Sequence, residues 1–196
     1  MKKVILILSA TLLVACNSSK DKKNSLENSA IEMATENSNK KINDTVPYED
    51  TVMLLGESNR QGLLMEPFKE WYNLGYSHYR TAPEVANELK PLLEDVSISV
   101  FMGTWCEDSQ RDVPHLYKIL DDTGFDESNL TLVNVNDEKT TPQGLEDGKD
   151  IINVPTIIFY KDGVELGRIV EYPIQTVEKD MLKILSGKNY KHAYAE

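Results

Sequence analysis

The sequence predicts an α/β fold in which a mixed central sheet is flanked by helices. In the middle of the chain, short apolar runs typical of buried strands lie on either side of a longer run with helical periodicity. Nearer the C-terminus, two strand-like runs are joined by Lys161-Asp162-Gly163, a hairpin turn of the Asp-Gly type, and a last helical pattern follows. A strand–helix–strand unit pairs its strands in parallel and a hairpin pairs them antiparallel, so the sheet is expected to be mixed.

Each element of this fold has its own signal in the sequence. The central helix carries Val113, Leu116, Tyr117 and Leu120 at the i, i+3, i+4 and i+7 spacing of one helix face. Thr176 is placed to cap the last helix. The elements before that last helix are expected at residues 98–102, 107–121, 130–135, 156–160 and 164–170.

Residues 51–80 are expected to form an N-terminal helical extension ahead of the main domain at residues 81–190. A helix can begin at Pro67, because the missing N–H of proline costs nothing at the first helical position. A second helix is expected from Pro83, with Pro91 as a kink inside it. The first helix also carries four aromatic residues, which suit core packing or, as an alternative, a binding surface: Trp71, Tyr72, Tyr76 and Tyr79.

The beginning of the chain has the features of a targeting signal. Two lysines precede a twelve-residue apolar run, which is too short to cross a bilayer of about 30 Å as a helix. The run ends in Leu13-Val14-Ala15-Cys16, which resembles the lipobox of bacterial lipoproteins. Residues 1–15 are therefore expected to be a signal peptide that is cut before Cys16, whose thiol is acylated. The alternative is an ordinary secretory signal with a chance cysteine.

Residues 16–50 are expected to be a lipidated, disordered tether. Between residues 17 and 46 there is no aromatic residue, and 23 of the 30 residues are Asn, Ser, Thr, Lys, Asp or Glu. Such a segment cannot bury enough apolar surface to offset its chain entropy, and its root-mean-square reach is roughly 30 Å. The domain is thus expected in the cell envelope, facing the periplasm. Asn17 is not the Asp that retains enteric lipoproteins in the inner membrane, so an outer-membrane anchor is favoured.

Charge and composition argue against several classes of partner. The net charge of −11 opposes binding to nucleic acid, which needs a basic surface. The three histidines, His78, His115 and His192, show no metal-ligand spacing. No glycine-rich phosphate loop is present. Neither a metal nor another cofactor is therefore expected.

The segment Trp105-Cys106-Glu107-Asp108-Ser109 lies where a predicted buried strand gives way to a helix. The free N–H groups and the dipole at a helix N-terminus favour a thiolate. Ser109 is three residues further on and can donate a hydrogen bond to the sulfur, whereas the charges of Glu107 and Asp108 oppose a second negative charge. This placement distinguishes Cys106 from an ordinary small buried residue.

Four features in this order make the chain resemble the thioredoxin superfamily over roughly residues 81–190. Trp105-Cys106 ends the first core strand, and Pro114 stands where that family kinks its active-site helix. Val154-Pro155-Thr156 matches the segment that carries the family's cis-proline opposite the reactive sulfur. The strand and turn after that proline match residues 156–163. The resemblance implies a thioredoxin-like fold.

Two departures from the family pattern bear on the chemistry. The usual CxxC motif is replaced by Cys106-Glu107-Asp108-Ser109, so the second, resolving thiol is missing. The family's buried acid, which helps to ionise the resolving thiol, corresponds to Val100. With Cys16 linked to lipid, Cys106 is the only free thiol, and no intrachain disulfide can form. The loss of the resolving thiol and the loss of the buried acid are consistent with each other, because that acid acts on that thiol.

These residues predict a thioredoxin-like lipoprotein that performs monothiol thiol–disulfide exchange, as an oxidoreductase or isomerase. Its expected partners are cysteine-containing envelope proteins or small-thiol adducts, together with an external thiol or reductase. The alternatives are a redox-inactive binding or scaffold module and, less favoured, a dimer linked through Cys106. The candidate catalytic residues are Cys106 and Ser109. The residues expected to contact substrate are Trp105, Glu107, Asp108, Val154 and Pro155.

Overall fold

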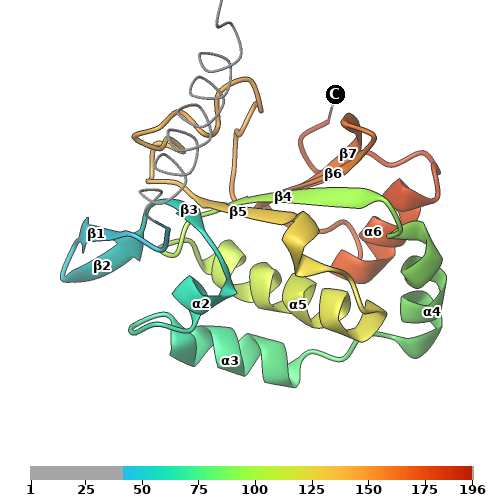
Figure 1. The fold of residues 1–196 in the computed structure, drawn as a ribbon, viewed down its shortest axis with the longest axis horizontal. Helices are drawn as coiled ribbons and strands as arrows, with labels where there is room; N and C mark the ends of the chain where they lie inside the picture. Colours follow the sequence, from blue (N-terminus) through green and yellow to red (C-terminus); the bar gives the residue numbers. More distant parts are fainter. Residues whose placement is uncertain (1–41, 196) are drawn as a thin grey trace, which may run out of the picture. The chain divides into compact units, whose positions relative to one another are not determined.

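A mixed sheet of five strands forms the centre of the structure, a computed structural model that describes residues 42–195 (Figure 1). β4 and β5 pair in parallel, and the other neighbouring strands pair antiparallel, which confirms the mixed sheet expected from the sequence. The predicted signal peptide, Cys16 and the tether up to residue 41 lie outside the described residues. In spatial order the strands are β3 (Gly56–Ser58), β5 (Leu130–Asn134), β4 (Val96–Met102), β6 (Thr156–Lys161) and β7 (Val164–Val170).

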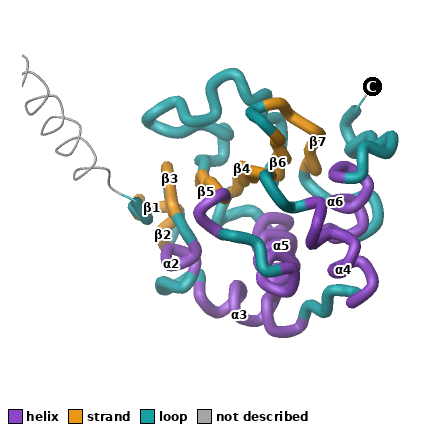
Figure 2. The backbone as a smooth tube through the Cα atoms, turned by 45° about the vertical axis from the view of Figure 1, so that its right-hand side comes forward, coloured by secondary structure: helices purple, strands orange, loops and turns teal. Residues whose placement is uncertain are grey.

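The longer helices pack on one face of this sheet, below it in Figures 1 and 2. Their buried sides and the facing side of the sheet form the main hydrophobic core, in which Leu116 and Phe159 are fully buried. These helices are α3 (Lys69–His78), α4 (Pro83–Leu92), α5 (Glu107–Thr123) and α6 (Val177–Leu185), with the short α2 (Arg60–Leu63) before α3 and a 3-10 turn at Glu127–Asn129.

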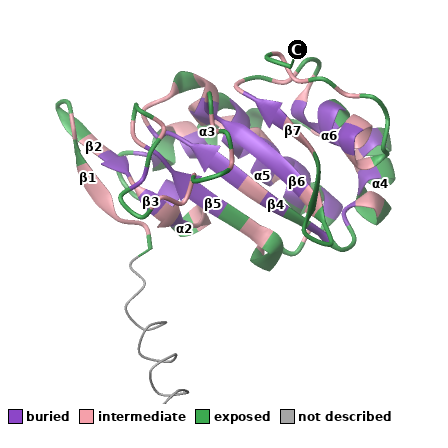
Figure 3. Ribbon diagram, turned by 90° about the horizontal axis from the view of Figure 1, so that it is seen from above, coloured by how far each residue is buried: buried purple, intermediate pink, exposed green. Residues whose placement is uncertain are grey.

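The opposite face of the sheet is covered in part by the loop that connects β5 to β6. Phe101, Val133 and Ile158 point to this side and form a smaller buried cluster with Val154. Leu145 of the loop packs against that cluster. Figure 3 looks onto this face, where buried parts of β4 and β6 lie side by side. The loop thereby brings the start of β6 close to the end of β4.

The structure confirms the elements that the sequence predicts from β4 onward, with ends that differ by at most two residues. The four residues assigned to the inner face of α5, Val113, Leu116, Tyr117 and Leu120, are all buried. α4 begins at Pro83 as expected and continues past Pro91. Thr176 is the N-cap residue of α6, although its side chain makes no capping hydrogen bond.

The segment before α3 differs from the sequence prediction. The composition predicts a tether up to residue 50 followed by helix, but a hairpin of β1 (Thr45–Tyr48) and β2 (Thr51–Leu54) lies there. Leu54 N–H donates to Thr104 Oγ1 across 3.1 Å, a contact between residues fifty positions apart. Local composition cannot reveal such a contact, so the sequence prediction placed the first half of the hairpin in the tether.

The predicted boundary at residue 81 is also wrong, because the main sheet begins earlier. β3 pairs antiparallel with β5 and so places Gly56–Ser58 inside the domain. Pro67 is not the first residue of a helix, since α3 starts at Lys69; the peptide bond between Glu66 and Pro67 is cis. The segment between residues 51 and 80 is thus part strand and part helix, and it belongs to the same unit as the sheet.

An ion-pair cluster joins α2, α3 and α5 at the surface. Both terminal nitrogens of Arg60 donate to the Asp121 carboxylate, at 2.7 and 2.8 Å. Tyr76 Oη donates to the same carboxylate at 2.7 Å, and Arg60 also pairs with Glu127 at 3.1 Å. The Arg60 guanidinium, aided by the Tyr76 hydroxyl, lowers the pKa of Asp121 below its ordinary value.

This lowered pKa predicts how Asp121 contributes to acid stability. A carboxylate whose pKa is depressed by folding stabilises the protein above its unfolded pKa of about 4, and this contribution disappears as the pH falls through the folded value. Asp121→Asn is therefore expected to cost about 1 kcal/mol at neutral pH, because the cluster is partly exposed. The difference in Tm between the two proteins should shrink as the pH falls from about 4 through the folded pKa of Asp121. A difference in Tm that stays constant with pH would contradict this contribution of the Asp121 carboxylate.

Candidate functional site

Cys106 lies at the point where β4 gives way to α5. β4 ends at Met102, a short turn follows, and Cys106 is the N-cap residue of α5 with φ −91° and ψ 123°. Its N–H donates to the carbonyl oxygen of Gly103 at 3.0 Å, and its own carbonyl accepts the N–H of Gln110 at 3.0 Å. The cysteine is half-buried and carries a free thiol. Its position at a helix N-terminus is the one expected from the sequence.

The fold brings Val154 and Pro155 to the sulfur from a distant part of the chain. The Cys106 thiol donates to the Val154 carbonyl oxygen, with Sγ and O 3.2 Å apart. The Val154–Pro155 peptide bond is cis, in agreement with what the family resemblance implies. Both residues are buried just before β6. The Cys106 sulfur and the cis-proline segment, 48 positions apart, therefore lie together.

Ser109 has a different role from the one expected. Its side chain is fully buried, and its Oγ accepts a hydrogen bond from the Gly103 N–H at 3.3 Å. Among the hydrogen bonds of residues 42–195, none joins this hydroxyl to the Cys106 sulfur. The predicted Ser109-to-sulfur bond is thus not formed, because the hydroxyl oxygen is oriented towards the turn after β4. Ser109 fixes the backbone that leads to Cys106.

The two acidic residues after Cys106 differ in their surroundings. Glu107 is exposed to solvent, and Asp108 forms an ion pair with Arg111 at 2.5 Å. Arg111 also pairs with Asp112, a nearly buried residue, at 2.7 Å. The guanidinium thus offsets much of the negative charge that Asp108 would otherwise place near the sulfur. Arg111 lies on the next turn of α5, and its positive charge reduces the electrostatic effect that the sequence analysis expected from Asp108.

Trp105 forms one wall beside Cys106. Its ring nitrogen donates to the Val135 carbonyl oxygen at 2.9 Å, which fixes the orientation of the indole. The Tyr48 ring, from the end of β1, lies over it with ring centroids 6.4 Å apart and an angle of 31°. Lys139 Nζ lies 5.9 Å from the indole centroid. Sequence reasoning missed Tyr48 because it placed that residue in the tether; its only signal was an aromatic residue directly after an aromatic-free segment.

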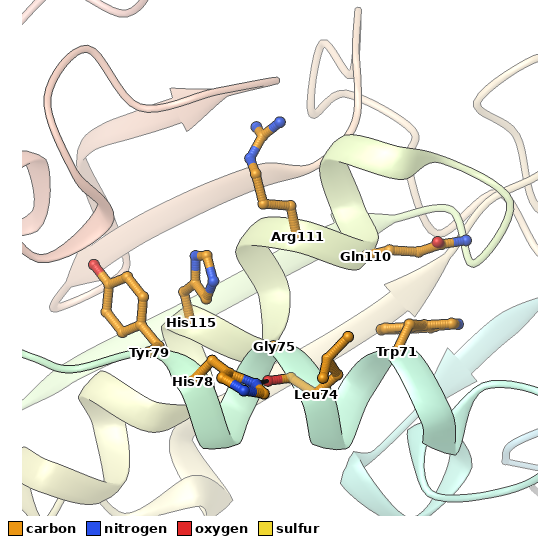
Figure 4. Close-up of a pocket in the computed structure, with 8 residues that line it drawn as sticks. All are labelled: Trp71, Leu74, Gly75, His78, Tyr79, Gln110, Arg111 and His115. Atoms are coloured by element: carbon orange, nitrogen blue, oxygen red, sulfur yellow. Dashed lines mark hydrogen bonds between the residues drawn. The ribbon is translucent and has the colours of Figure 1, made fainter.

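Two cavities lie on the helical side of the site. The larger has a volume of about 610 Å³ and lies between α3 and α5, where Figure 4 shows Trp71 and Leu74 facing Gln110. The smaller has a volume of about 310 Å³ and lies next to Trp105. Of the four aromatic residues on the predicted helix face, Tyr72 is buried in the core and Trp71 lines both cavities. That helix face therefore contributes both to the core and to the lining of the two cavities.

His115 belongs to a local cluster, away from the sulfur. Its ring stacks on Tyr79 with centroids 4.1 Å apart, and its Nδ1 lies 3.7 Å from an Asp112 carboxylate oxygen. Within residues 42–195, no group of three or more His, Cys, Asp or Glu side chains is arranged to hold a metal ion. The same part of the chain contains no helix that is both long and apolar enough to traverse a bilayer.

Comparisons with known proteins give similarity to solved structures only. No protein-family model matches the sequence, and a search of curated proteins also gives no match. A protein of unknown function from Pseudomonas aeruginosa is 16% identical, with 63% of this chain and 99% of that chain covered and a TM-score of 0.38. The oxidised form of mitochondrial thioredoxin 3 from Saccharomyces cerevisiae is 21% identical, with 49% and 86% covered and a TM-score of 0.30.

The order of elements identifies the architecture independently of those scores. β4, α5 and β5 form a parallel strand–helix–strand unit, and β6, β7 and α6 complete it as an antiparallel pair with a last helix. The cysteine begins the central helix, and a cis-proline directly precedes β6. This is a mixed α/β protein with a thioredoxin-like fold.

Proposed function

We propose that this protein performs monothiol thiol–disulfide exchange through Cys106. One observation carries the proposal: the sulfur of Cys106, a partly buried residue at the N-terminus of α5, lies 3.2 Å from the carbonyl oxygen of Val154, next to cis-Pro155. The sequence contains one other cysteine, Cys16, which belongs to the proposed lipid anchor. The site therefore has an attacking thiol and no resolving thiol.

The chemistry is a balanced exchange that needs no cofactor. The Cys106 thiolate attacks one sulfur of a substrate disulfide, forms a mixed disulfide with it, and expels the other sulfur as a thiolate. A second thiol of the same substrate can then displace Cys106, which isomerises the substrate's disulfides. An external thiol or a reductase can also displace it. Each step exchanges one S–S bond for another, and Cys106 leaves as the thiolate with which it began.

The surrounding residues prepare the sulfur for this step. The sulfur belongs to the N-cap residue of α5, and Arg111 forms an ion pair with Asp108 beside it in the sequence. Before ionisation the thiol donates to the Val154 carbonyl, which holds the sulfur facing the cis-proline segment. Trp105 and Glu107 flank Cys106 in the sequence, and we propose that they contact the substrate. Ser109 supports this geometry through Gly103 and makes no direct contact with the sulfur.

We further propose that the domain works in the cell envelope, tethered through a lipid on Cys16. The support is the sequence Leu13-Val14-Ala15-Cys16 after a short apolar run, followed by a polar segment rich in Asn, Ser and Lys. An outer-membrane anchor facing the periplasm remains the favoured placement. The partners are then cysteine-containing envelope proteins or small-thiol adducts, and a separate thiol or reductase regenerates Cys106.

A second candidate function is a redox-inactive binding module. The 610 Å³ cavity between α3 and α5 favours it, because apolar cavities of this size commonly hold ligands or peptide side chains. In this case partner binding would not depend on the sulfur. The proposed exchange instead requires Cys106 for every covalent complex.

Covalent capture in intact cells separates the two functions. Cells that express the wild-type protein are treated with acid to quench thiols, and complexes are identified on non-reducing gels and by mass spectrometry. We expect disulfide-linked partners with wild type and none with Cys106→Ala, because the mixed disulfide needs this sulfur. Ser186→Ala, an exposed position after α6, is a matched control and should leave capture unchanged. Partner capture that persists in Cys106→Ala would instead support the binding module.

A further inference from the structure

The indole ring of Trp105 lies directly against the backbone of Gly103. A Cβ atom added to Gly103 would lie 2.4 Å from the indole Cε2, 2.5 Å from Nε1 and 2.9 Å from Cζ2. These distances are far shorter than the separation of about 3.5–4.0 Å at which carbon atoms attract each other. The φ of Gly103 lies outside the left-handed region, so its backbone conformation does not require glycine. The position of the indole does.

The hydrogen bond of the indole makes this requirement specific. Trp105 Nε1 donates to the Val135 carbonyl oxygen at 2.9 Å, and it is the same nitrogen that a Cβ on residue 103 would approach to 2.5 Å. The Val135 N–H donates to the Met102 carbonyl at 2.8 Å, which ties that acceptor to the end of β4. A side chain at position 103 therefore excludes the hydrogen bond between Trp105 and Val135.

The β1–β2 hairpin adds two further contacts to the turn at residues 103–105. The Tyr48 ring lies over the Trp105 ring, with centroids 6.4 Å apart and an angle of 31°. At the end of β2, the Leu54 N–H donates to Thr104 Oγ1 at 3.1 Å. The contacts that Gly103, Val135 and Tyr48 make with the indole, hereafter the indole clamp, thus come from three separate parts of the chain.

The indole clamp and Cys106 share the same turn. The Gly103 carbonyl accepts the Cys106 N–H at 3.0 Å, and the Gly103 N–H donates to Ser109 Oγ at 3.3 Å. Trp105 and Cys106 also pack against one apolar cluster, which includes Val154. Both residues are only partly buried, so solvent still reaches them. The fold therefore holds a partly exposed indole in one orientation next to the residue that carries the sulfur.

We propose that Gly103 and Tyr48 are positioning residues, which hold the Trp105 indole as a fixed surface for the polypeptide around a substrate disulfide. This inference rests on the proposed exchange at Cys106 and names the residues that set its preference for polypeptide over small disulfides. A small disulfide needs only the sulfur, whereas a polypeptide also rests on the indole. A ring that is already fixed loses little conformational freedom when substrate binds, so the clamp favours binding.

The test compares two probes that react with Cys106 in the chain without its signal segment. One is a peptide whose cysteine is activated as its thionitrobenzoate disulfide, and the other is the small neutral 2,2′-dithiodipyridine. We expect Gly103→Ala to lower the rate with the peptide, relative to the small probe, by about fivefold or more. Tyr48→Ala should lower this ratio by about threefold, and Tyr48→Phe, which keeps the ring, should match the wild type.

A double-mutant cycle separates the indole clamp from a general disturbance of the turn. Trp105→Ala should lower the ratio as well, and adding Gly103→Ala to it should change the ratio no further, because the ring that the new Cβ displaces is gone. An equal loss from Gly103→Ala with and without the indole would overturn the inference, and so would a wild-type ratio in Tyr48→Ala. The Tyr48 variants decide the question if Gly103→Ala does not fold.

The fluorescence of Trp105 gives a readout that does not depend on exchange. The sequence contains two tryptophans, so Trp71→Phe leaves Trp105 as the only one. In that background, Gly103→Ala and Tyr48→Ala should each increase quenching of the emission by acrylamide, because the released indole is more exposed. Unchanged quenching in both would overturn the clamp while exchange at Cys106 stands. If the wild type reacts with neither probe, the proposed exchange itself is wrong, and the positioning role fails with it.

Discussion

Replacing Ser109 with cysteine is expected to make the protein release a captured substrate at least about 100-fold faster. Position 109 is one helical turn after Cys106, where the family pattern places the resolving thiol. A second thiol there attacks the mixed disulfide from within the same molecule. Well-oriented intramolecular reactions reach effective molarities of about 10⁵ M, so even a poorly aligned thiol should exceed the rate given by a millimolar external thiol.

The measurement follows the mixed disulfide by intact mass after a single exchange with a peptide disulfide. The wild-type adduct should persist until thiol is added, whereas in Ser109→Cys it should decay without any addition, as Cys106 forms an intrachain disulfide with the introduced thiol. Ser109→Ala is the control, since it also removes the acceptor of the Gly103 N–H but adds no thiol. An adduct that decays equally fast in all three proteins would show that wild type already has a route of release.

The second large effect concerns the proposed lipid anchor. Cys16→Ala is expected to move nearly all of the protein from the membrane fraction to the soluble fraction, because no acyl chain can then be attached to that side chain. A single acyl chain binds membranes only marginally and several bind firmly, so loss of the acylation site should change the distribution almost completely. Fractionation with detergent-phase partitioning measures the effect.

The cysteine in the site provides the control for this experiment. Cys106→Ala should remain fully in the membrane fraction, because the sulfur at the start of α5 takes no part in anchoring. Protein that stays in the membrane fraction after Cys16→Ala would contradict the lipobox interpretation. In that case the segment before residue 16 would be an anchor of another kind.

The sequence could predict the second half of the fold because its signals are local. β4 and α5 are specified by a short, mainly apolar run and by a four-residue helical stripe whose members are all buried. The turn that joins β6 to β7 is specified by Asp162-Gly163, in which both residues have positive φ. Cys106, Val154 and Pro155 were found together because a family pattern relates them, although they are far apart in the chain.

The parts that the sequence missed depend on contacts between distant residues. Tyr48 gains its place from the Trp105 ring, and β3 gains its place from pairing with β5, neither of which a local pattern can show. For Ser109 the spacing predicted the correct helix turn but the wrong hydrogen bond. The tight turn at Gly103 presents a backbone N–H that would otherwise be buried without an acceptor, and the buried Ser109 hydroxyl accepts from it.

The most direct test of the monothiol mechanism counts the thiols that are released when the protein reacts with a disulfide. Purified protein lacking residues 1–16, with Cys106 reduced, is mixed with an excess of an intermolecular peptide disulfide and no added thiol. Exchange at a single sulfur conserves the number of thiols, so we expect one peptide thiol released per protein and one peptide held on Cys106. Two thiols released per protein, with no peptide retained, would contradict the monothiol mechanism.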